Sequence, residues 1–215
     1  MRDTVRAVGL AAALLGWSAT APRLPQEWNP LPHMVFSGAV TLLSRPSLGL
    51  RPAQLRRGVR WGSAAAAPVG LGVAAGLMAP AVRAGMAARD LPAAPARWLL
   101  LRIPFATVGP EELAYRAVLG DAATRAFGPR VGKLFTAVVF GLSHVPDARA
   151  AGDNVPGTVV VTGAAGWVFS WLHESSGSLA APVLAHLAVN EAGAVAALAV
   201  QQRRSGRGRP TGAAR

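Results

Sequence analysis

Residues 61–82 carry no charged side chain, and this run restricts the fold more than any other feature of the chain. Its length is about the ~20 residues that a helix needs to cross the apolar core of a bilayer. Alanine and glycine are frequent in it, which favours close helix–helix packing in lipid. Other apolar runs precede and follow it, so the sequence predicts a protein that crosses a membrane several times.

The composition excludes several classes of protein. Charged residues make up 15% of the 215 residues, against roughly a quarter in soluble domains. The 22 Lys+Arg exceed the 10 Asp+Glu. In so apolar a chain we interpret this excess as the flanks of membrane helices rather than as a nucleic-acid surface. Because cysteine is absent, the chain has no disulfide, thiolate metal site or cysteine nucleophile.

The apolar runs predict an all-α fold, a polytopic transmembrane helical bundle of about seven or eight segments with any polar site in its core. We interpret the first run as an uncleaved helix, since Pro22 would directly follow its A-x-A site. The expected organisation is membrane helices over 1–95, a core over 96–202 that contains most of the polar candidates, and a basic, disordered tail over 203–215. The runs are 5–21, 31–50, 61–82, 98–108, 133–145, 159–172 and 179–200, with a further helix from Pro110 to Gly128.

Arginine-rich segments predict the topology. The loop 51–60 and the tail 203–215 are both basic, so both are expected on the cytoplasmic side. That arrangement requires an even number of crossings between them. The clear spans give five, or six if 98–108 crosses separately from the helix that begins at Pro110. Arginine far outnumbers lysine, and this bias towards GC-rich codons favours a bacterial plasma membrane.

A pair of glutamates stands in one of the apolar helices, where ionisable side chains are functional candidates. Glu112 and Arg116 are four residues apart on one helix face, so they can pair. Glu111 lies about 100° round the same helix and faces elsewhere. The structural alternative is a charge cluster at the membrane interface.

Two other apolar helices each carry a histidine. Phe140 precedes His144 by one turn, and His186 precedes Asn190 by one turn. Taken singly, each histidine fits a packing role, and Asn190 fits a hydrogen bond between helices. Taken together with the glutamates, the set suits hydrolysis. A carboxylate and a histidine can activate water, and a second histidine with an amide can stabilise an oxyanion. Two histidines and a glutamate also suit a metal.

Three motifs therefore occur in order: E-E-x-x-x-R at 111–116, F-x-x-x-H at 140–144 and H-x-x-x-N at 186–190. This ordered set resembles the CAAX protease and bacteriocin-processing enzyme family (CPBP, or Abi) of intramembrane proteases. Eukaryotic members of that family remove the last three residues of prenylated CAAX proteins. The resemblance extends over residues 96–200. Tyr115 departs from it, because the family usually has Phe at that position, and Ala117 stands where Gly is frequent.

The resemblance implies an intramembrane endopeptidase and a role for each residue. Glu111 and His144 would activate water, His186 and Asn190 would form the oxyanion site, and Glu112, Arg116 and Phe140 would support them. No cofactor is required by this mechanism. Zinc is the alternative, with Glu111, His144 and His186 as its ligands, although the H-E-x-x-H arrangement is absent. The expected partners are the lipid bilayer and a membrane protein or a lipidated or peptide substrate, with no nucleic acid.

Two other functions fit the same polar core. One is a non-catalytic membrane protein, either a bacteriocin self-immunity factor or a scaffold, and the other is an ion-coupled transporter. Convergence of Glu111, His144 and His186 within a few ångström favours the enzyme. A transporter would instead place them along a path.

Overall fold

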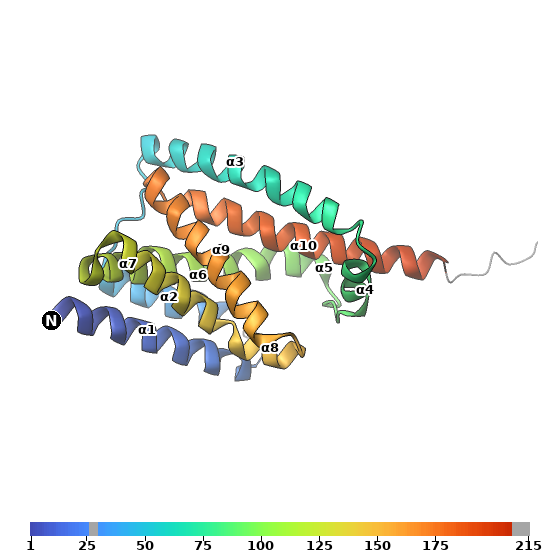
Figure 1. Ribbon diagram of the computed structural model, residues 1–215, viewed down its shortest axis with the longest axis horizontal. Coiled ribbons are helices and arrows are strands. Elements are labelled where there is room, and N and C mark those ends of the chain that lie inside the picture. The colour runs from blue at the N-terminus through green and yellow to red at the C-terminus, as the bar shows by residue number, and fades with distance from the viewer. Residues whose placement is uncertain (26–29, 208–215) are drawn as a thin grey trace, which may run out of the picture.

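The computed structural model describes residues 1–25 and 30–207. Throughout these residues the fold is all-helical, as predicted, and contains no strand. Figure 1 shows the longer helices lying side by side in a bundle. In chain order the helices are α1 (Arg2–Thr20), η1 (Ala21–Arg23), α2 (Leu31–Ser44), α3 (Pro52–Gly76), α4 (Pro80–Ala88), α5 (Pro95–Arg97), η3 (Trp98–Val108), α6 (Gly109–Glu111), η4 (Glu112–Leu119), α7 (Gly120–Ser143), α8 (Val145–Ala151), α9 (Val155–Ser176) and α10 (Ala180–Arg207).

One long helix occupies the middle of the chain. α5, η3, α6, η4 and the first part of α7 follow one another without a break, and η3 and η4 are wound as π-helix. The run ends at Gly128, whose φ of 79° and ψ of 169° are not helical, and α7 then turns back. The segment 98–108 therefore does not cross the bundle separately from the helix at Pro110. The basic segment 51–60, predicted as a loop, is the start of α3. Five helical passes follow Arg51: α3, this long helix, the second part of α7, α9 and α10.

Fewer helices have the length and composition of a membrane span than the sequence predicts. Three qualify among the described residues: Arg2–Arg23, Val155–Ser176 and Ala180–Arg204. A fourth arises if Pro52–Gly76 and Pro80–Ala88, which meet at 96°, form one broken span. The predicted seven or eight segments thus include pieces that are short, such as the 14-residue α2, or interrupted.

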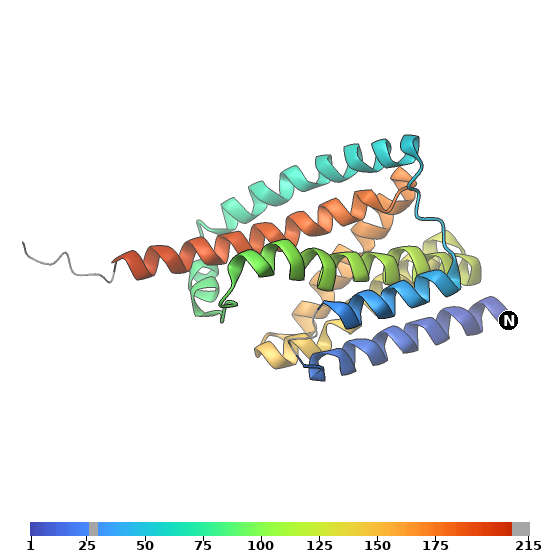
Figure 2. The same ribbon diagram turned by 180° about the vertical axis from the view of Figure 1, so that it is seen from behind.

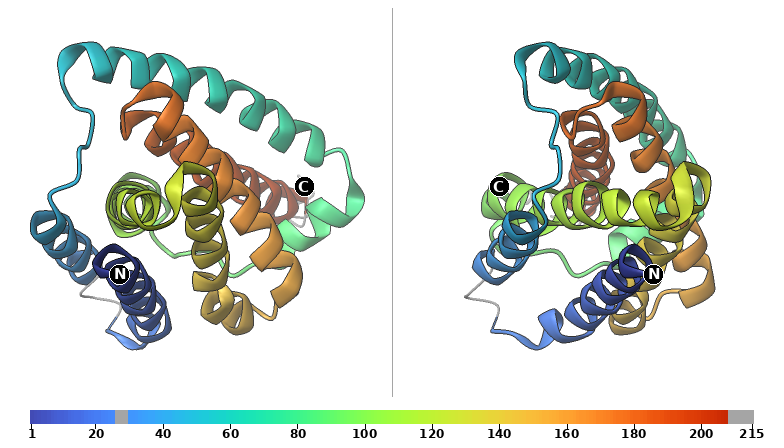
Figure 3. Two further views of the ribbon diagram at one scale, coloured as in Figure 1. Left: turned by 60° about the vertical axis from the view of Figure 1, so that its left-hand side comes forward. Right: turned by 90° about the vertical axis from the view of Figure 1, so that its left-hand side faces the viewer.

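The helix ends follow local sequence signals. Asn154 caps α9, because its side-chain oxygen accepts a hydrogen bond from the Gly157 N–H at 2.7 Å. Gly177 ends α9 in the left-handed conformation, with φ of 65°. α2 ends at Ser44, with Arg45 in the left-handed conformation at its C-cap, and the loop 45–51 then leads to the start of α3 (Figure 3).

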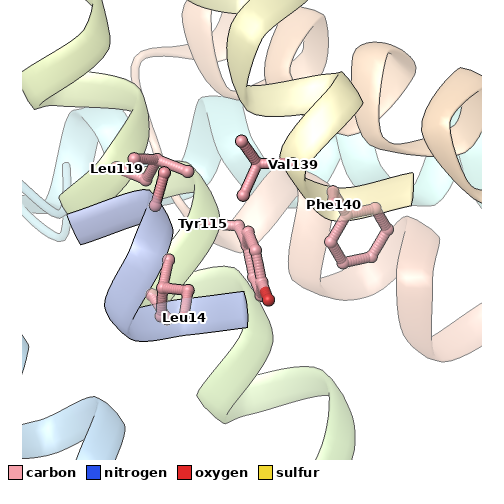
Figure 4. Close-up of a cluster of buried hydrophobic side chains, with 7 residues drawn as sticks. Leu14, Tyr115, Leu119, Val139 and Phe140 are labelled. Carbon is pink, nitrogen blue, oxygen red and sulfur yellow. The ribbon is translucent and has the colours of Figure 1, made fainter. Parts of the chain in front are cut away.

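Two kinds of contact hold the bundle together. α1 packs on η4 and α7 through an apolar cluster that includes Leu14, Tyr115 and Leu119 (Figure 4). α3 packs on α10 through glycine, and a Cβ on Gly62 would lie 2.8 Å from Ala181 O. Such close backbone approach is the packing that glycine permits between helices in lipid.

The basic segment 51–60 and the tail lie at opposite ends of the bundle, which does not fit the prediction that both are cytoplasmic. α3 and α10 run parallel, and both begin at the same end (Figures 1 and 2). Residues 51–60, at the start of α3, are at that end, whereas α10 reaches the tail at the other end, where Gln201 donates to Arg89 O at 2.7 Å. If α10 crosses a membrane, the segment 51–60 and the tail cannot both be cytoplasmic. The five passes between them agree with this, because an odd number leaves them on opposite sides.

The predicted tail begins as helix. α10 continues to Arg207, and residues 208–215 lie outside the described part of the chain. Their predicted disorder stays a prediction.

Candidate active site

Glu112, Arg116 and His186 form a buried cluster in the middle of the bundle. Arg116 Nε lies 3.2 Å from Glu112 Oε2, and both side chains are fully buried. His186 Nδ1 lies 2.9 Å from Glu112 Oε1, so the imidazole N–H donates to the carboxylate. The predicted pair on η4 is therefore present. It also fixes a histidine that is 74 residues further along the chain.

Aromatic rings surround the Arg116 guanidinium. Its Cζ lies 4.2 Å from the centroid of the Phe140 ring and 5.5 Å from that of Phe169. Arg116 Nε and Glu112 Oε2 form an ion pair at 3.2 Å without a hydrogen bond, and the Nη atoms of Arg116 have no hydrogen-bond partner. The rings thus provide cation–π contacts, which gain strength where water is excluded. Phe140, predicted as a supporting residue, lies against Arg116.

Glu111 faces a different environment from Glu112. Its side chain is 27% exposed, its Oε2 lies 3.9 Å from His186 Nε2, and that oxygen is buried without a hydrogen-bond partner. Adjacent residues of a helix point about 100° apart, so one carboxylate is held inside the cluster while the other reaches a cavity.

This cavity measures about 310 Å³. Glu111 and His144 both line it, together with Tyr115 from η4. In a π-helix, with i→i+5 hydrogen bonds, residues four or five apart share a face. Ala106, Glu111 and Tyr115 have that spacing, and all three line the cavity.

His144 caps the end of α7 with a defined ring orientation. Its Nδ1 lies 2.8 Å from Phe140 O, and because a carbonyl can only accept, Nδ1 carries the proton. In the neutral imidazole Nε2 is then the basic nitrogen. The Phe140 ring lies between the two predicted catalytic histidines, with its centroid 4.7 Å from that of His144 and 6.1 Å from that of His186.

α10 supplies His186 and Asn190. The His186 ring stacks on Phe169 with centroids 4.7 Å apart. Asn190, one turn later, has a buried Nδ2 without a hydrogen-bond partner. An amide donor left unpaired inside a protein is costly, and such a group is available to a bound ligand.

The sequence did not identify the rest of the cavity wall. Trp17 and His33, from the first two helices, line it, as do Ser143 and Asp147 beside His144. For Tyr115 a signal existed, since it follows Glu111 by four residues in the helix. Nothing local in the sequence links Trp17 or His33 to residues a hundred positions away.

Two further polar residues of the bundle lie away from the cavity. Glu174 pairs with Lys133, and His173 lines the same surface pocket as both of them. Among the described residues, no three His, Asp or Glu side chains are grouped so that they could hold a metal ion.

Comparison with known proteins gives one match. Residues 93–192 match the family described as type II CAAX prenyl endopeptidase Rce1-like. No curated protein and no solved structure matches the sequence. The matched segment contains all three motifs and every polar residue of the buried cluster. Residues 93–192 are therefore similar to the Rce1-like CAAX proteases, in agreement with the family that the motifs resemble.

Proposed function

We propose that the protein is an intramembrane endopeptidase that hydrolyses a peptide bond with a water activated by Glu111 and His144. The observation that carries the proposal is a pair of buried polar atoms without internal partners. Glu111 Oε2 can accept a proton, and Asn190 Nδ2 can donate a hydrogen bond. Both are placed beside His186, which lies on the same helix as Asn190.

In the proposed reaction, Glu111 removes a proton from a water whose oxygen attacks the carbonyl carbon of the scissile bond. His144 orients that water through its basic Nε2. The carbonyl becomes a tetrahedral oxyanion, which accepts hydrogen bonds from Asn190 Nδ2 and from protonated His186 Nε2. The C–N bond then breaks, and the proton held by Glu111 passes to the leaving amine.

Glu112 and Arg116 act behind the reacting groups. Glu112 accepts from His186 Nδ1, which fixes the ring and stabilises it when it is protonated. Arg116 balances the charge of Glu112. The Glu112–Arg116 ion pair thus supports the groups that hold the catalytic water and the oxyanion, and it does not contact the substrate.

The substrate class follows from the surroundings of the site. Apolar side chains from α1, α2 and η3 line the cavity, so a lipidated peptide or an apolar membrane segment suits it better than nucleic acid. Asp147 of the lining belongs to α8. The loop after α8 is joined to the α4 end by Arg89 and Asp153, 3.9 Å apart. The cavity thus lies at the end of the bundle that carries the basic tail. We propose that this end is cytoplasmic, in a bacterial plasma membrane, and that the basic segment 51–60 at the start of α3 is on the other side.

A non-catalytic scaffold or a transporter accounts less well for this arrangement. A scaffold does not need a buried carboxylate oxygen without a hydrogen-bond partner, such as Glu111 Oε2, at a cavity. In a transporter the ionisable groups would follow a path across the membrane, whereas here the His186 ring lies 3.9 Å from a Glu111 oxygen and 2.9 Å from a Glu112 oxygen.

Comparative proteomics of membranes tests the proposal. Cells that express the wild type are compared with cells that express Glu111→Gln, and the wild type alone is expected to generate new peptide termini in membrane proteins or lipidated peptides. Glu191→Gln is the matched control, because Glu191 adjoins Asn190 but is not part of the cluster. Identical sets of termini in all three samples would refute the protease function.

A further inference from the structure

A basic pocket lies at the tail end of the bundle, apart from the proposed active site. It forms where α3 ends and α4 turns away from it at 96°. Figure 1 shows α4 lying beside the end of α10. Gln201 of α10 donates to Met86 O and to Arg89 O, which holds the end of α4 against α10. The pocket measures about 600 Å³, a size typical of ligand sites.

Three arginines line this pocket, and none of the described residues that line it is acidic. They are Arg83 of α4 and Arg203 and Arg204 of α10. The ion pairs between described residues involve other side chains. The three positive charges are therefore not balanced by such a pair, and together they attract an anion.

Arg83 has a defined orientation. Its Nη1 donates to Leu77 O at 2.6 Å and to Met78 O at 2.9 Å, at the end of α3. A guanidinium has five N–H groups, so three remain after these two bonds. Its planar fork of donors matches the oxygens of a phosphate. Because backbone carbonyls already fix the side chain, it loses less freedom when it binds a ligand.

The rest of the pocket is apolar. Its four other lining residues are Leu77, Met78, Ala199 and Val200. Met78 is 79% exposed, and the candidate span of α10 ends at Arg204. Where an apolar membrane helix gives way to arginines, the lipid headgroups begin. A phospholipid suits both parts of the pocket, with its phosphate on the arginines and its acyl chains on the apolar side chains, whereas a free phosphate suits only the first.

We propose that this pocket binds the headgroup of an anionic phospholipid. Basic pockets between membrane helices accept such headgroups. A lipid with net negative charge is favoured over a zwitterionic one, because the cation of a zwitterionic headgroup is repelled by the three arginines. The proposal requires that α10 spans a membrane, and it is independent of the protease function.

Native mass spectrometry of the full chain in detergent, titrated with phosphatidylglycerol or with phosphatidylcholine, measures the affinity for each lipid. The wild type should bind phosphatidylglycerol more tightly. A triple variant with Arg83, Arg203 and Arg204 changed to Gln should bind it about 10²-fold more weakly, since each basic residue near an anionic lipid contributes about fivefold. Arg203→Gln/Arg204→Gln leaves the Arg83 hydrogen bonds in place, so it tests the pocket if the triple variant does not fold. It should bind about 25-fold more weakly.

The matched control makes the same change in net charge at the other end of the bundle. Arg51→Gln/Arg56→Gln/Arg60→Gln alters the start of α3, and it should bind phosphatidylglycerol like the wild type. Equal affinities in the control and the pocket variants would overturn the proposal, because net charge and not the pocket would then determine binding. Equal affinity of the wild type for the two lipids would overturn it as well.

Inorganic phosphate distinguishes a lipid from a soluble anion. Met78→Gln, which alters the apolar part of the pocket, should weaken the binding of phosphatidylglycerol, and inorganic phosphate should not displace the lipid. Complete displacement by inorganic phosphate, with no effect of Met78→Gln, would show that the pocket accepts a soluble anion and would overturn the assignment to a lipid.

Discussion

The two faces of the helix 109–119 differ in what they leave unpaired. On the cavity face, Glu111 keeps an oxygen without a partner, and its side chain is partly exposed. On the buried face, Glu112 is paired twice, with Arg116 and His186, and is closed off from solvent. A rotation of about 100° between successive residues thus separates the reacting carboxylate from the one that supports it. Glu111 and Glu112 are adjacent and chemically identical, yet their roles are separable, one in activity and one in stability.

The largest expected effect is on the buried face. Arg116→Ala leaves the Glu112 carboxylate buried without its cation, so we expect the free energy of unfolding in detergent to fall by about 3–5 kcal/mol. Arg125→Ala is the control. Arg125 pairs with Asp121 at the same i,i+4 spacing on the next turns of the chain, but that pair is exposed, and its loss should cost about 1 kcal/mol or less. Equal stability of the two variants would remove the distinction between the faces.

On α10, Asn190→Ala should affect turnover and leave stability unchanged. Loss of an oxyanion donor typically lowers kcat by about 10²–10³. Because Asn190 Nδ2 has no hydrogen-bond partner in the folded protein, loss of this donor breaks no internal hydrogen bond. Turnover of a reporter substrate and thermal unfolding are measured on the same preparation, with Glu191→Gln beside it. A destabilised but active Asn190→Ala would show that this amide joins helices.

A substitution in the α3–α10 contact, far from both faces of the helix 109–119, should lower stability without changing turnover. A Cβ at position 62 would lie 2.8 Å from Ala181 O and from Leu184 Cβ, so Gly62→Ala should destabilise the α3–α10 contact by about 1–3 kcal/mol. Gly72→Ala is matched to it, since nothing lies within 4 Å of that position on the same helix. The folded fraction of Gly62→Ala should retain wild-type kcat. A loss of kcat would extend the site to α3.

The smallest effect is expected at the tail. Deletion of residues 208–215 should leave turnover unchanged, because this segment has too few apolar residues to bury. Its sidedness is decided by labelling, since the chain has no native cysteine. Ser47→Cys and Ser205→Cys should react with an impermeant reagent from opposite sides of the membrane. Modification of both from the same side would contradict the parallel arrangement of α3 and α10.

What the sequence predicted well was local. The i,i+4 pairing of Glu112 with Arg116 follows from helix geometry alone, as does the different direction of Glu111. The breaks at Gly128 and Gly177 follow from the freedom of glycine to adopt positive φ, which both residues use. The all-helical fold follows from the length and spacing of the apolar runs.

What it missed depends on contacts between distant segments. The hydrogen bond from His186 to Glu112 and the cavity lining from Trp17 and His33 require the tertiary packing of several helices. Arginines stand at both ends of the bundle, so counting basic residues does not distinguish the ends, and the sidedness of the tail stays a prediction. Pro110 lies inside the long helix, so the chain stays helical where the sequence predicts that Pro110 begins a new helix.

The central claim is tested most directly by a comparison of Glu111→Gln with Glu112→Gln in one preparation, with turnover and the free energy of unfolding measured for each. Glu111→Gln should lose about 10² or more in kcat, the usual scale for a general base, and unfold like the wild type within about 0.5 kcal/mol. Glu112→Gln leaves Arg116 uncompensated and should lose about 3–5 kcal/mol of stability. Wild-type turnover in Glu111→Gln, or an equal loss of stability in both variants, would contradict the assignment of chemistry to one glutamate and support to the other.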